Sequence, residues 1–148
     1  MGKTARSFFS KEQKEDIKQA ILNAELDTSG EIRVHIENVC DGEVMNRAAY
    51  IFKKLKIDDT EQRNGVLFYL AVKNRKFAIV GDEGINKTVP EDFWEGIKLK
   101  MLNHFRDGDF TGGLVEGISI IGKYLKKHYP YRTDDVNELS DEISFGKD

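Results

Sequence analysis

Hydrophobic residues recur at helical spacing in four stretches of the chain, and each stretch predicts an amphipathic helix. The first helix is expected to begin after Ser10, because Ser10 and Gln13 form a capping-box pattern ahead of the apolar stripe. It should end near the turn at residues 27–30. The other three stripes cover residues 44–55, 93–105 and 114–125. For the third helix, Thr88 is the expected N-cap and Glu91 closes a second capping box.

Three further stretches predict strands. Residues 31–37 alternate between apolar and polar, which is typical of a strand with one buried and one polar face. Residues 66–72 are continuously apolar, which indicates a central strand covered on both faces. Residues 77–80 return after a short turn at residues 73–75, and Asn74 suits that turn because it tolerates unusual backbone angles.

The order of these elements predicts an α/β fold. A strand-helix-strand unit implies a parallel pair with a right-handed crossover, and the following hairpin adds an antiparallel strand. We therefore expect a three-layer α/β/α sandwich around a small mixed sheet. The domain should span residues 8–130. Residues 131–148 are acidic and poorly periodic, and we expect a flexible tail there, with Ile143 and Phe145 as residues that could dock.

Composition excludes several classes of protein. The chain has 148 residues and a formal net charge of −3, so it has no basic excess and we expect no nucleic-acid partner. No stretch approaches the roughly 20 apolar residues of a membrane span, although peripheral association with a membrane stays open. The N-terminus lacks the long apolar region of a signal peptide, and Cys40 is the single cysteine. These features predict a cytoplasmic protein.

Several short motifs occur together in the order and spacing of the TPM domain, and the chain resembles that family from Ser10 to Tyr129. The motifs are Thr28-Ser29-Gly30-Glu31-Ile32, Arg63-Asn64-Gly65-Val66-Leu67, Asn74-Arg75-Lys76, Val80-Gly81, and Phe105-Arg106-Asp107-Gly108-Asp109-Phe110 with Gly113-Leu114. The family is named for a thylakoid-lumen phosphatase, a photosystem II repair factor and a receptor modulator. The resemblance implies an α/β/α sandwich, acid phosphatase activity or divalent-cation binding, and a role beside membranes.

Acidic residues in predicted loops are the main candidates for chemistry. Asp82 and Glu83 follow the third strand, and Asp107 and Asp109 lie between the last two helices. Hard cations such as Ca²⁺ or Mg²⁺ need several oxygen ligands, which loop carboxylates can supply. We expect the third strand to deliver Asp82 and Glu83 to a ligand-binding edge of the sheet, because open α/β sheets bind ligands beyond the carboxyl ends of their strands. Whether all four carboxylates meet there is left open.

Two residues before the central strand, Arg63 and Asn64, are candidates for binding phosphate. An arginine can bind a phosphate or pair with Asp82, whereas Asn64-Gly65 can simply form the turn into the strand. The segment from Asp107 to Gly112 starts like an EF-hand loop, but its twelfth position is Ile118 instead of a bidentate Glu. A turn in which Asp109 or Thr111 caps the next helix is the simpler interpretation.

Three hypotheses for function follow. The first is a small divalent-cation-binding interaction or regulatory module, because carboxylates are scattered over loops without a nucleophile-base pair. The second is a weak metal-assisted acid phosphatase, in which a metal orients the phosphate and Arg63 stabilises charge. The third is a ligand-free protein–protein interaction module, with an unknown partner and with Tyr124, Tyr129 and Tyr131 as a docking surface. No organic cofactor is expected.

Overall fold

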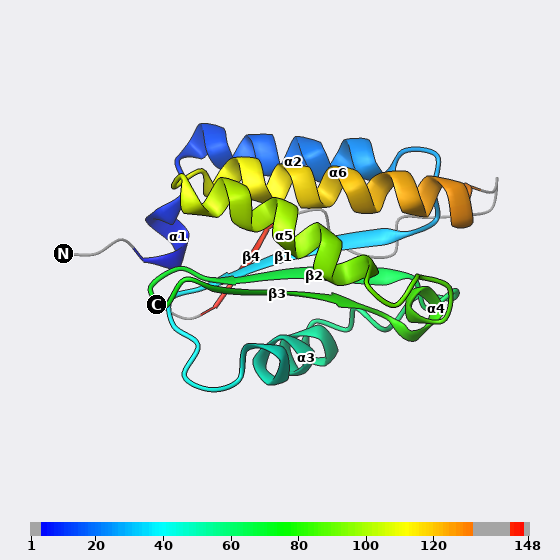
Figure 1. Cartoon of the computed structure of the whole chain (residues 1–148), viewed down its shortest axis with the longest axis horizontal. Coiled ribbons are helices and arrows are strands. Elements are labelled where there is room, and N and C mark those ends of the chain that lie inside the picture. The colour runs from blue at the N-terminus through cyan, green and yellow to red at the C-terminus, as the bar shows by residue number, and fades with distance from the viewer. Residues whose placement is uncertain (1–3, 132–142, 147–148) are drawn as a thin grey trace.

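The structure is a computed structural model that describes residues 4–131 and 143–146. The helices are α1 (Ala5–Phe8), α2 (Lys11–Glu25), α3 (Val44–Lys54), α4 (Glu83–Asn86), α5 (Phe93–Arg106) and α6 (Phe110–His128). The strands are β1 (Glu31–Glu37), β2 (Gly65–Ala71), β3 (Lys76–Gly81) and β4 (Ser144–Phe145), and they form one sheet of order β3-β2-β1-β4. Figure 1 shows this sheet lying between helices.

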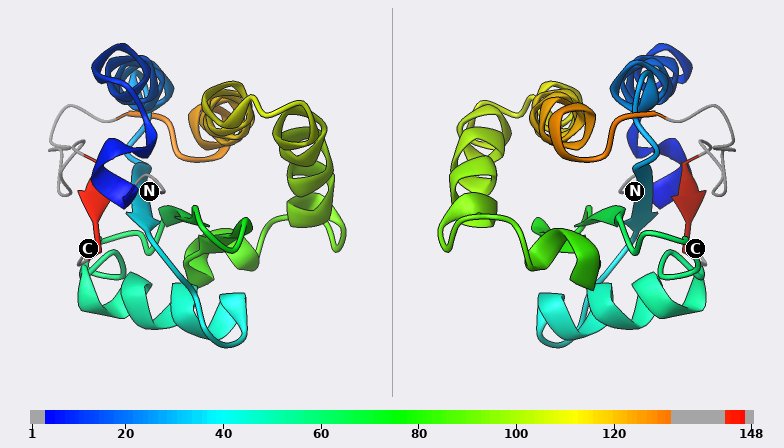
Figure 2. Two further views of the ribbon diagram at one scale, coloured as in Figure 1. Left: turned by 90° about the vertical axis from the view of Figure 1, so that its left-hand side faces the viewer. Right: turned by 90° about the vertical axis from the view of Figure 1, so that its right-hand side faces the viewer.

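The sheet is mixed, as the sequence predicted. β1 and β2 run parallel and are joined through α3, whereas β2 and β3 form the antiparallel hairpin. Figure 2 shows α2, α6 and α5 side by side over one face, with α3 under the other. The three-layer α/β/α sandwich is therefore confirmed.

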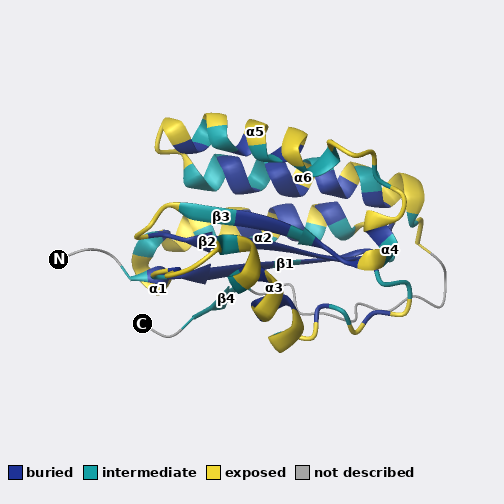
Figure 3. Cartoon of the chain, turned by 60° about the horizontal axis from the view of Figure 1, so that its bottom comes forward, coloured by how far each residue is buried: buried dark blue, intermediate teal, exposed yellow. Residues whose placement is uncertain are grey.

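Each face of the sheet carries its own apolar cluster. The larger cluster joins Ile32, Phe68 and Ile79 to the inner faces of α2, α5 and α6, and the smaller one joins Leu67 and Tyr69 to α3. All seven residues of β2 are buried, as expected for a central strand covered on both sides (Figure 3).

Local sequence signals explain where some elements begin. The capping box at the start of α2 is confirmed: Gln13 N donates to Ser10 Oγ at 3.1 Å, and Ser10 N donates to Gln13 Oε1 at 2.8 Å. Asp109 is the N-cap of α6 and accepts a hydrogen bond from Gly112 N at 2.8 Å. The expected cap at Thr88 was wrong, because its Oγ1 donates to Ile85 O and α5 begins only at Phe93.

Two further features differ from the prediction. Every residue of β1 except Arg33 is buried, so the polar face of this strand lies inside the molecule and not against solvent. Within the predicted tail, Ile143 and Phe145 dock against the larger cluster as the sequence allowed, but the strand β4, which pairs with β1, was not predicted. Residues 132–142 and 147–148 of that predicted tail lie outside the described residues.

Candidate functional site

The four candidate carboxylates lie at two separate places. Asp82 and Glu83 open α4 directly after β3, whereas Asp107 and Asp109 lie between α5 and α6. Figure 1 shows that α4 and the α5–α6 connection are at opposite ends of α5. With 14 residues, α5 is about 21 Å long. The structure therefore keeps the two pairs apart and forms no single site from all four.

The orientation of β3 explains this separation. β3 runs antiparallel to β2, and Val66 near the start of β2 pairs with Gly81 at the end of β3. Asp82 and Glu83 consequently lie at the amino ends of β1 and β2, and the expectation that they reach the carboxyl edge of the parallel strands was wrong. α5 then runs back along the sheet, with Trp94 beside Gly81 and Phe105 against Phe77 at a centroid distance of 4.8 Å.

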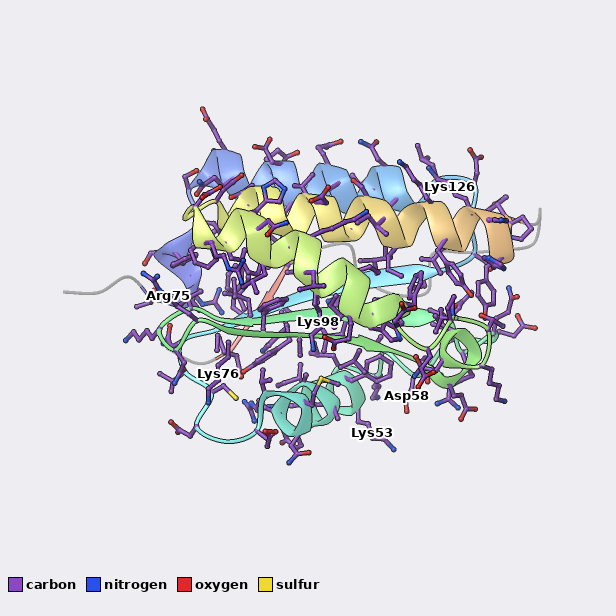
Figure 4. All side chains as sticks on the ribbon, in the orientation of Figure 1. Lys53, Asp58, Arg75, Lys76, Lys98 and Lys126 are labelled. Atoms are coloured by element: carbon purple, nitrogen blue, oxygen red, sulfur yellow. The ribbon has the colours of Figure 1, made fainter. Side chains whose placement is uncertain are left out.

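Arg63 pairs with the first of these acidic sets. Its Nε lies 2.8 Å from Asp82 Oδ2, its Nη2 lies 2.9 Å from Asp82 Oδ1, and its Nη1 lies 3.2 Å from Glu83 Oε1. The hydrogen bonds with Asp82 raise the pKa of Arg63 against the opposing effect of desolvation, so the guanidinium stays charged. Asp58 adds a further negative charge at this end of the molecule, where Figure 4 labels it.

Asn64, the other phosphate candidate, points into the protein. It is 1% exposed, and its Nδ2 donates to Ser29 Oγ at 3.2 Å, an oxygen that also accepts from Gln62 Nε2 at 2.7 Å. Its backbone N–H donates to Thr60 Oγ1. These contacts join the start of β1 to the loop before β2, so the structure gives Asn64 a role in holding the two parallel strands together.

The α5–α6 connection is the more open of the two acidic places. The ring of His104 lies between two carboxylates, with Nδ1 3.2 Å from Asp109 Oδ2 and Nε2 3.1 Å from Glu116 Oε1. The hydrogen bond with Asp109 is the main reason that the pKa of His104 is raised, and Glu116 adds to it. The side chains of Asp109 and Glu116 are 54% and 41% exposed. Asp107 is also exposed.

The fit of a metal ion to these residues is limited. Within residues 4–131 and 143–146, no three His, Cys, Asp or Glu side chains come together closely enough to hold an ion. Asp82 has both carboxylate oxygens bound to Arg63. The exposed carboxylates of the α5–α6 connection fit a hydrated ion held by one or two protein oxygens. They do not fit an ion that has lost its waters and is coordinated by protein ligands alone.

A buried polar network on β1 was missed by the sequence reasoning. Glu37 accepts from Tyr69 Oη at 2.5 Å and from Arg47 Nε and Nη2 at 2.9 and 2.5 Å. Burial alone would raise the pKa of Glu37, but the hydrogen bonds from Arg47 and Tyr69 outweigh it and lower the pKa to about 2. His35 lies next to it, with Nε2 3.5 Å from Glu37 Oε2, and burial lowers the pKa of His35.

This network borders a cavity of about 560 Å³ between α3, β1 and β4. The polar residues that alternate with the apolar ones in β1 were the sequence signal for this network. Beside a strand as apolar as β2, a residue such as His35 or Glu37 must lie near the core, and its charge then needs a partner. The partner itself, Arg47 on α3, could not be chosen from sequence spacing.

Comparison with known proteins identifies the family. The sequence profile of the TPM domain matches residues 4–124. The structure is similar to the NMR structure of the BA42 protein from the psychrophilic bacterium Bizionia argentinensis, with a TM-score of 0.87 and 44% identity, covering 94% of this chain and 96% of that one. No curated protein matches the chain.

Two more distant structures share the fold alone. The N-terminal domain of a P. gingivalis protein has a TM-score of 0.70 and 19% identity, covering 84% of this chain and 82% of that one. The N-terminal domain of a Corynebacterium glutamicum protein has a TM-score of 0.63 and 14% identity, covering 80% and 74%. Among the described residues, no helix has the length and apolarity that crossing a membrane requires. With its profile match and its 44% identical relative, this chain belongs to the TPM-domain family.

Proposed function

We propose that this TPM domain is a small divalent-cation-binding module that serves interaction or regulation, and that its main cation site is the α5–α6 connection. The observation that carries the proposal is the position of His104 between Asp109 and Glu116. Two carboxylates there already surround a group that can carry positive charge. A divalent cation bound by the same carboxylates would take the place of the imidazolium.

The ligand chemistry favours Ca²⁺ or Mg²⁺. Asp109 and Glu116 offer carboxylate oxygens, which hard cations prefer, and the exposed Asp107 lies two residues before Asp109 in the sequence. One oxygen of Asp109 caps α6 through Gly112 N, which leaves Oδ2 facing outward toward His104. With so few protein ligands the ion would keep several waters, and we expect dissociation constants of about 0.1–1 mM.

Asp82 and Glu83, the other acidic pair, are the weaker candidates for binding a metal ion. An ion at Asp82 and Glu83 would have to compete with Arg63, which already pairs with both side chains. The same ion pairs argue against the phosphatase hypothesis, because the guanidinium that would stabilise a phosphate faces two carboxylates instead. We therefore rank cation binding above phosphoryl chemistry.

Isothermal titration calorimetry with Ca²⁺ tests this proposal. We expect wild-type protein to bind, Glu116→Gln to weaken binding at least five-fold, and Asp109→Asn to do the same while keeping the helix cap, since Asn also caps well. Glu83→Gln is the matched control, and its affinity should stay within two-fold of wild type. Absence of binding at about 5 mM Ca²⁺, or equal weakening by Glu83→Gln, would overturn the proposed site.

A further inference from the structure

The C-terminal residues 143–146 return to the fold and close the edge of β1. Ser144 and Phe145 form β4, which pairs in parallel with His35 and Ile36. Figure 1 shows β4 beside β1, far along the chain from the other strands of the sheet. Elsewhere on the same edge, Ile32 N donates to a side chain, Glu25 Oε2, at 2.8 Å. The amide of Ile32 is therefore already occupied, and β4 pairs further along the strand, at His35 and Ile36.

Main-chain and hydroxyl contacts hold the segment in register. Gly146 N donates to Ile36 O at 2.9 Å, and Ser144 Oγ lies 3.2 Å from Val34 O and 2.7 Å from His35 Nδ1. The hydroxyl thus meets one backbone acceptor and one buried ring nitrogen. An apolar residue at this position would leave His35 Nδ1 without that partner, so the edge favours a hydroxyl residue.

Side-chain contacts set two further preferences. The ring of Phe145 lies under two cations, with Arg6 Cζ and Lys14 Nζ 5.2 and 5.3 Å from its centroid, which favours an aromatic residue. A Cβ added at Gly146 would lie 2.7 Å from Glu37 Cγ. Glu37 cannot move aside easily, because Arg47 and Tyr69 hold its carboxylate. The last position therefore favours glycine.

The groove around the segment is basic. Three lysines and one acid, Lys11, Lys14, Lys18 and Glu15, line a cavity of about 270 Å³ together with Ile143 and Phe145, so positive charge is in excess there. In the sequence, Asp141 and Glu142 come directly before Ile143. The charge of the groove and the charge of this part of the chain are therefore complementary, which favours acidic residues ahead of the docked segment.

The segment pairs with β1 over a short length. β4 has two residues, and all four residues from Ile143 to Gly146 keep intermediate exposure. A strand this short gains little from its ladder, and such regions open at low free energy. Attachment to the same chain compensates, because a tethered segment acts at a local concentration on the order of millimolar.

We propose that the edge of β1 is a peptide-docking groove, and that residues 143–146 are its resident intramolecular ligand. The partner that fits this groove is an extended acidic peptide that adds in parallel beside β1. Its docked residues are an apolar residue, Ser or Thr, an aromatic residue and Gly, in that order. This is recognition by strand addition, in which main-chain bonds give affinity and side-chain pockets give specificity. The inference does not depend on cation binding at the α5–α6 connection.

The test uses the full chain and a fluorescent synthetic peptide with the sequence of residues 140–147, Ser-Asp-Glu-Ile-Ser-Phe-Gly-Lys. In Phe145→Ala protein the resident ligand is weakened but the groove residues are intact. Fluorescence anisotropy should show the peptide binding this variant at least ten-fold more tightly than wild type. Gly146→Val weakens the resident ligand by a different route and should give the same gain.

Two controls make the assignment specific. A peptide with Ala in place of its Phe should bind neither protein, and Lys14→Glu added to Phe145→Ala should reduce binding at least five-fold. Equal binding to wild type and Phe145→Ala, or no binding to either variant, would overturn the proposal. A wild-type protein that is dimeric by light scattering, and becomes monomeric with Phe145→Ala, would also overturn it, because the occupant would then come from a second copy.

Discussion

The guanidinium of Arg63 holds both carboxylate oxygens of Asp82, with Nε 2.8 Å from Oδ2 and Nη2 2.9 Å from Oδ1. Arg63 adopts a positive φ of 52°, which is uncommon for a residue with a side chain. Asp82 is 5% exposed, and its Oδ1 also accepts from Glu83 N to cap α4. The pair thus ties the loop before β2 to the turn after β3.

The first prediction concerns this pair. Asp82→Ala removes both the cap and the ion pair, and we expect a loss of at least about 1 kcal/mol from the cap alone. Arg63→Ala leaves a buried carboxylate without its cation, so it should also lower stability in urea unfolding. The double variant Arg63→Ala/Asp82→Ala should lose clearly less than the two single variants added together. Strict additivity would show that the pair is not coupled.

Acid stability should depend on Glu37. Its pKa in the folded protein is about 2, below the usual 4.5, so folding is favoured when the group is ionised. This contribution is complete above pH 4.5 and is lost as the pH falls toward 2. Its size is about 3 kcal/mol, since each pKa unit corresponds to 1.36 kcal/mol. Urea unfolding at a series of pH values measures it.

The matched variant for that measurement is Glu37→Gln, which keeps the shape of the side chain but not its titration. It should be less stable than wild type at neutral pH, because Arg47 and Tyr69 lose a charged acceptor. Between pH 4.5 and 2 its stability should fall much less than that of wild type. Parallel acid curves for the two proteins would contradict the role of Glu37.

Glycines in two helices should respond in opposite directions to alanine. A Cβ added at Gly122 in α6 would lie 2.6 Å from Ala24 Cβ and 2.9 Å from Ala24 Cα, so the helices α2 and α6 approach closely there. Gly122→Ala should therefore destabilise the protein despite a gain in helix propensity of about 1 kcal/mol, since overpacking costs about 1–3 kcal/mol. Gly96 in α5 has no neighbour within 4 Å of such a Cβ. Gly96→Ala should raise the melting temperature, and a rise with Gly122→Ala would disprove the close approach.

Calcium affinity should increase with pH if His104 competes with the ion. The pKa of His104 is raised, chiefly by its hydrogen bond with Asp109, so the imidazolium persists to higher pH than usual. As the pH rises through this pKa, the competing positive charge is lost and Ca²⁺ should bind more tightly. Calorimetry at about pH 6 and about pH 9 should show this gain in wild type. In His104→Gln the affinity should be nearly independent of pH over that range.

Local patterns predicted much of the fold. The capping box at Ser10, the alternating pattern of β1 and the apolar run of β2 each depend on residues close in sequence. Each correctly located its element, although the polar face expected for β1 is buried. Thr88 also has a capping-box pattern, but it does not cap α5. It lies directly after α4, a one-turn helix that Asp82 caps, and such a short element leaves no periodicity to detect.

The candidate site was harder to predict, because it depends on the direction of whole elements. The sequence showed that Asp82 follows a strand and that Asp109 lies between two helices. It did not show that β3 runs antiparallel to β2 and that α5 runs back along the sheet, which places the two residues at opposite ends of α5. Likewise, the partners of Glu37 could not be predicted, because Arg47 and Tyr69 converge on it from two other elements. Contacts between residues on separate elements carry no signal in local spacing.

Residue-resolved amide NMR during a Ca²⁺ titration tests the central claim, cation binding at the α5–α6 connection, most directly. We predict that saturable shifts concentrate on residues 104–116, with little change at Arg63, Asp82 and Glu83, where the guanidinium already pairs with both carboxylates. Shifts centred on Asp82 and Glu83, or no localised shifts at millimolar Ca²⁺, would contradict the account.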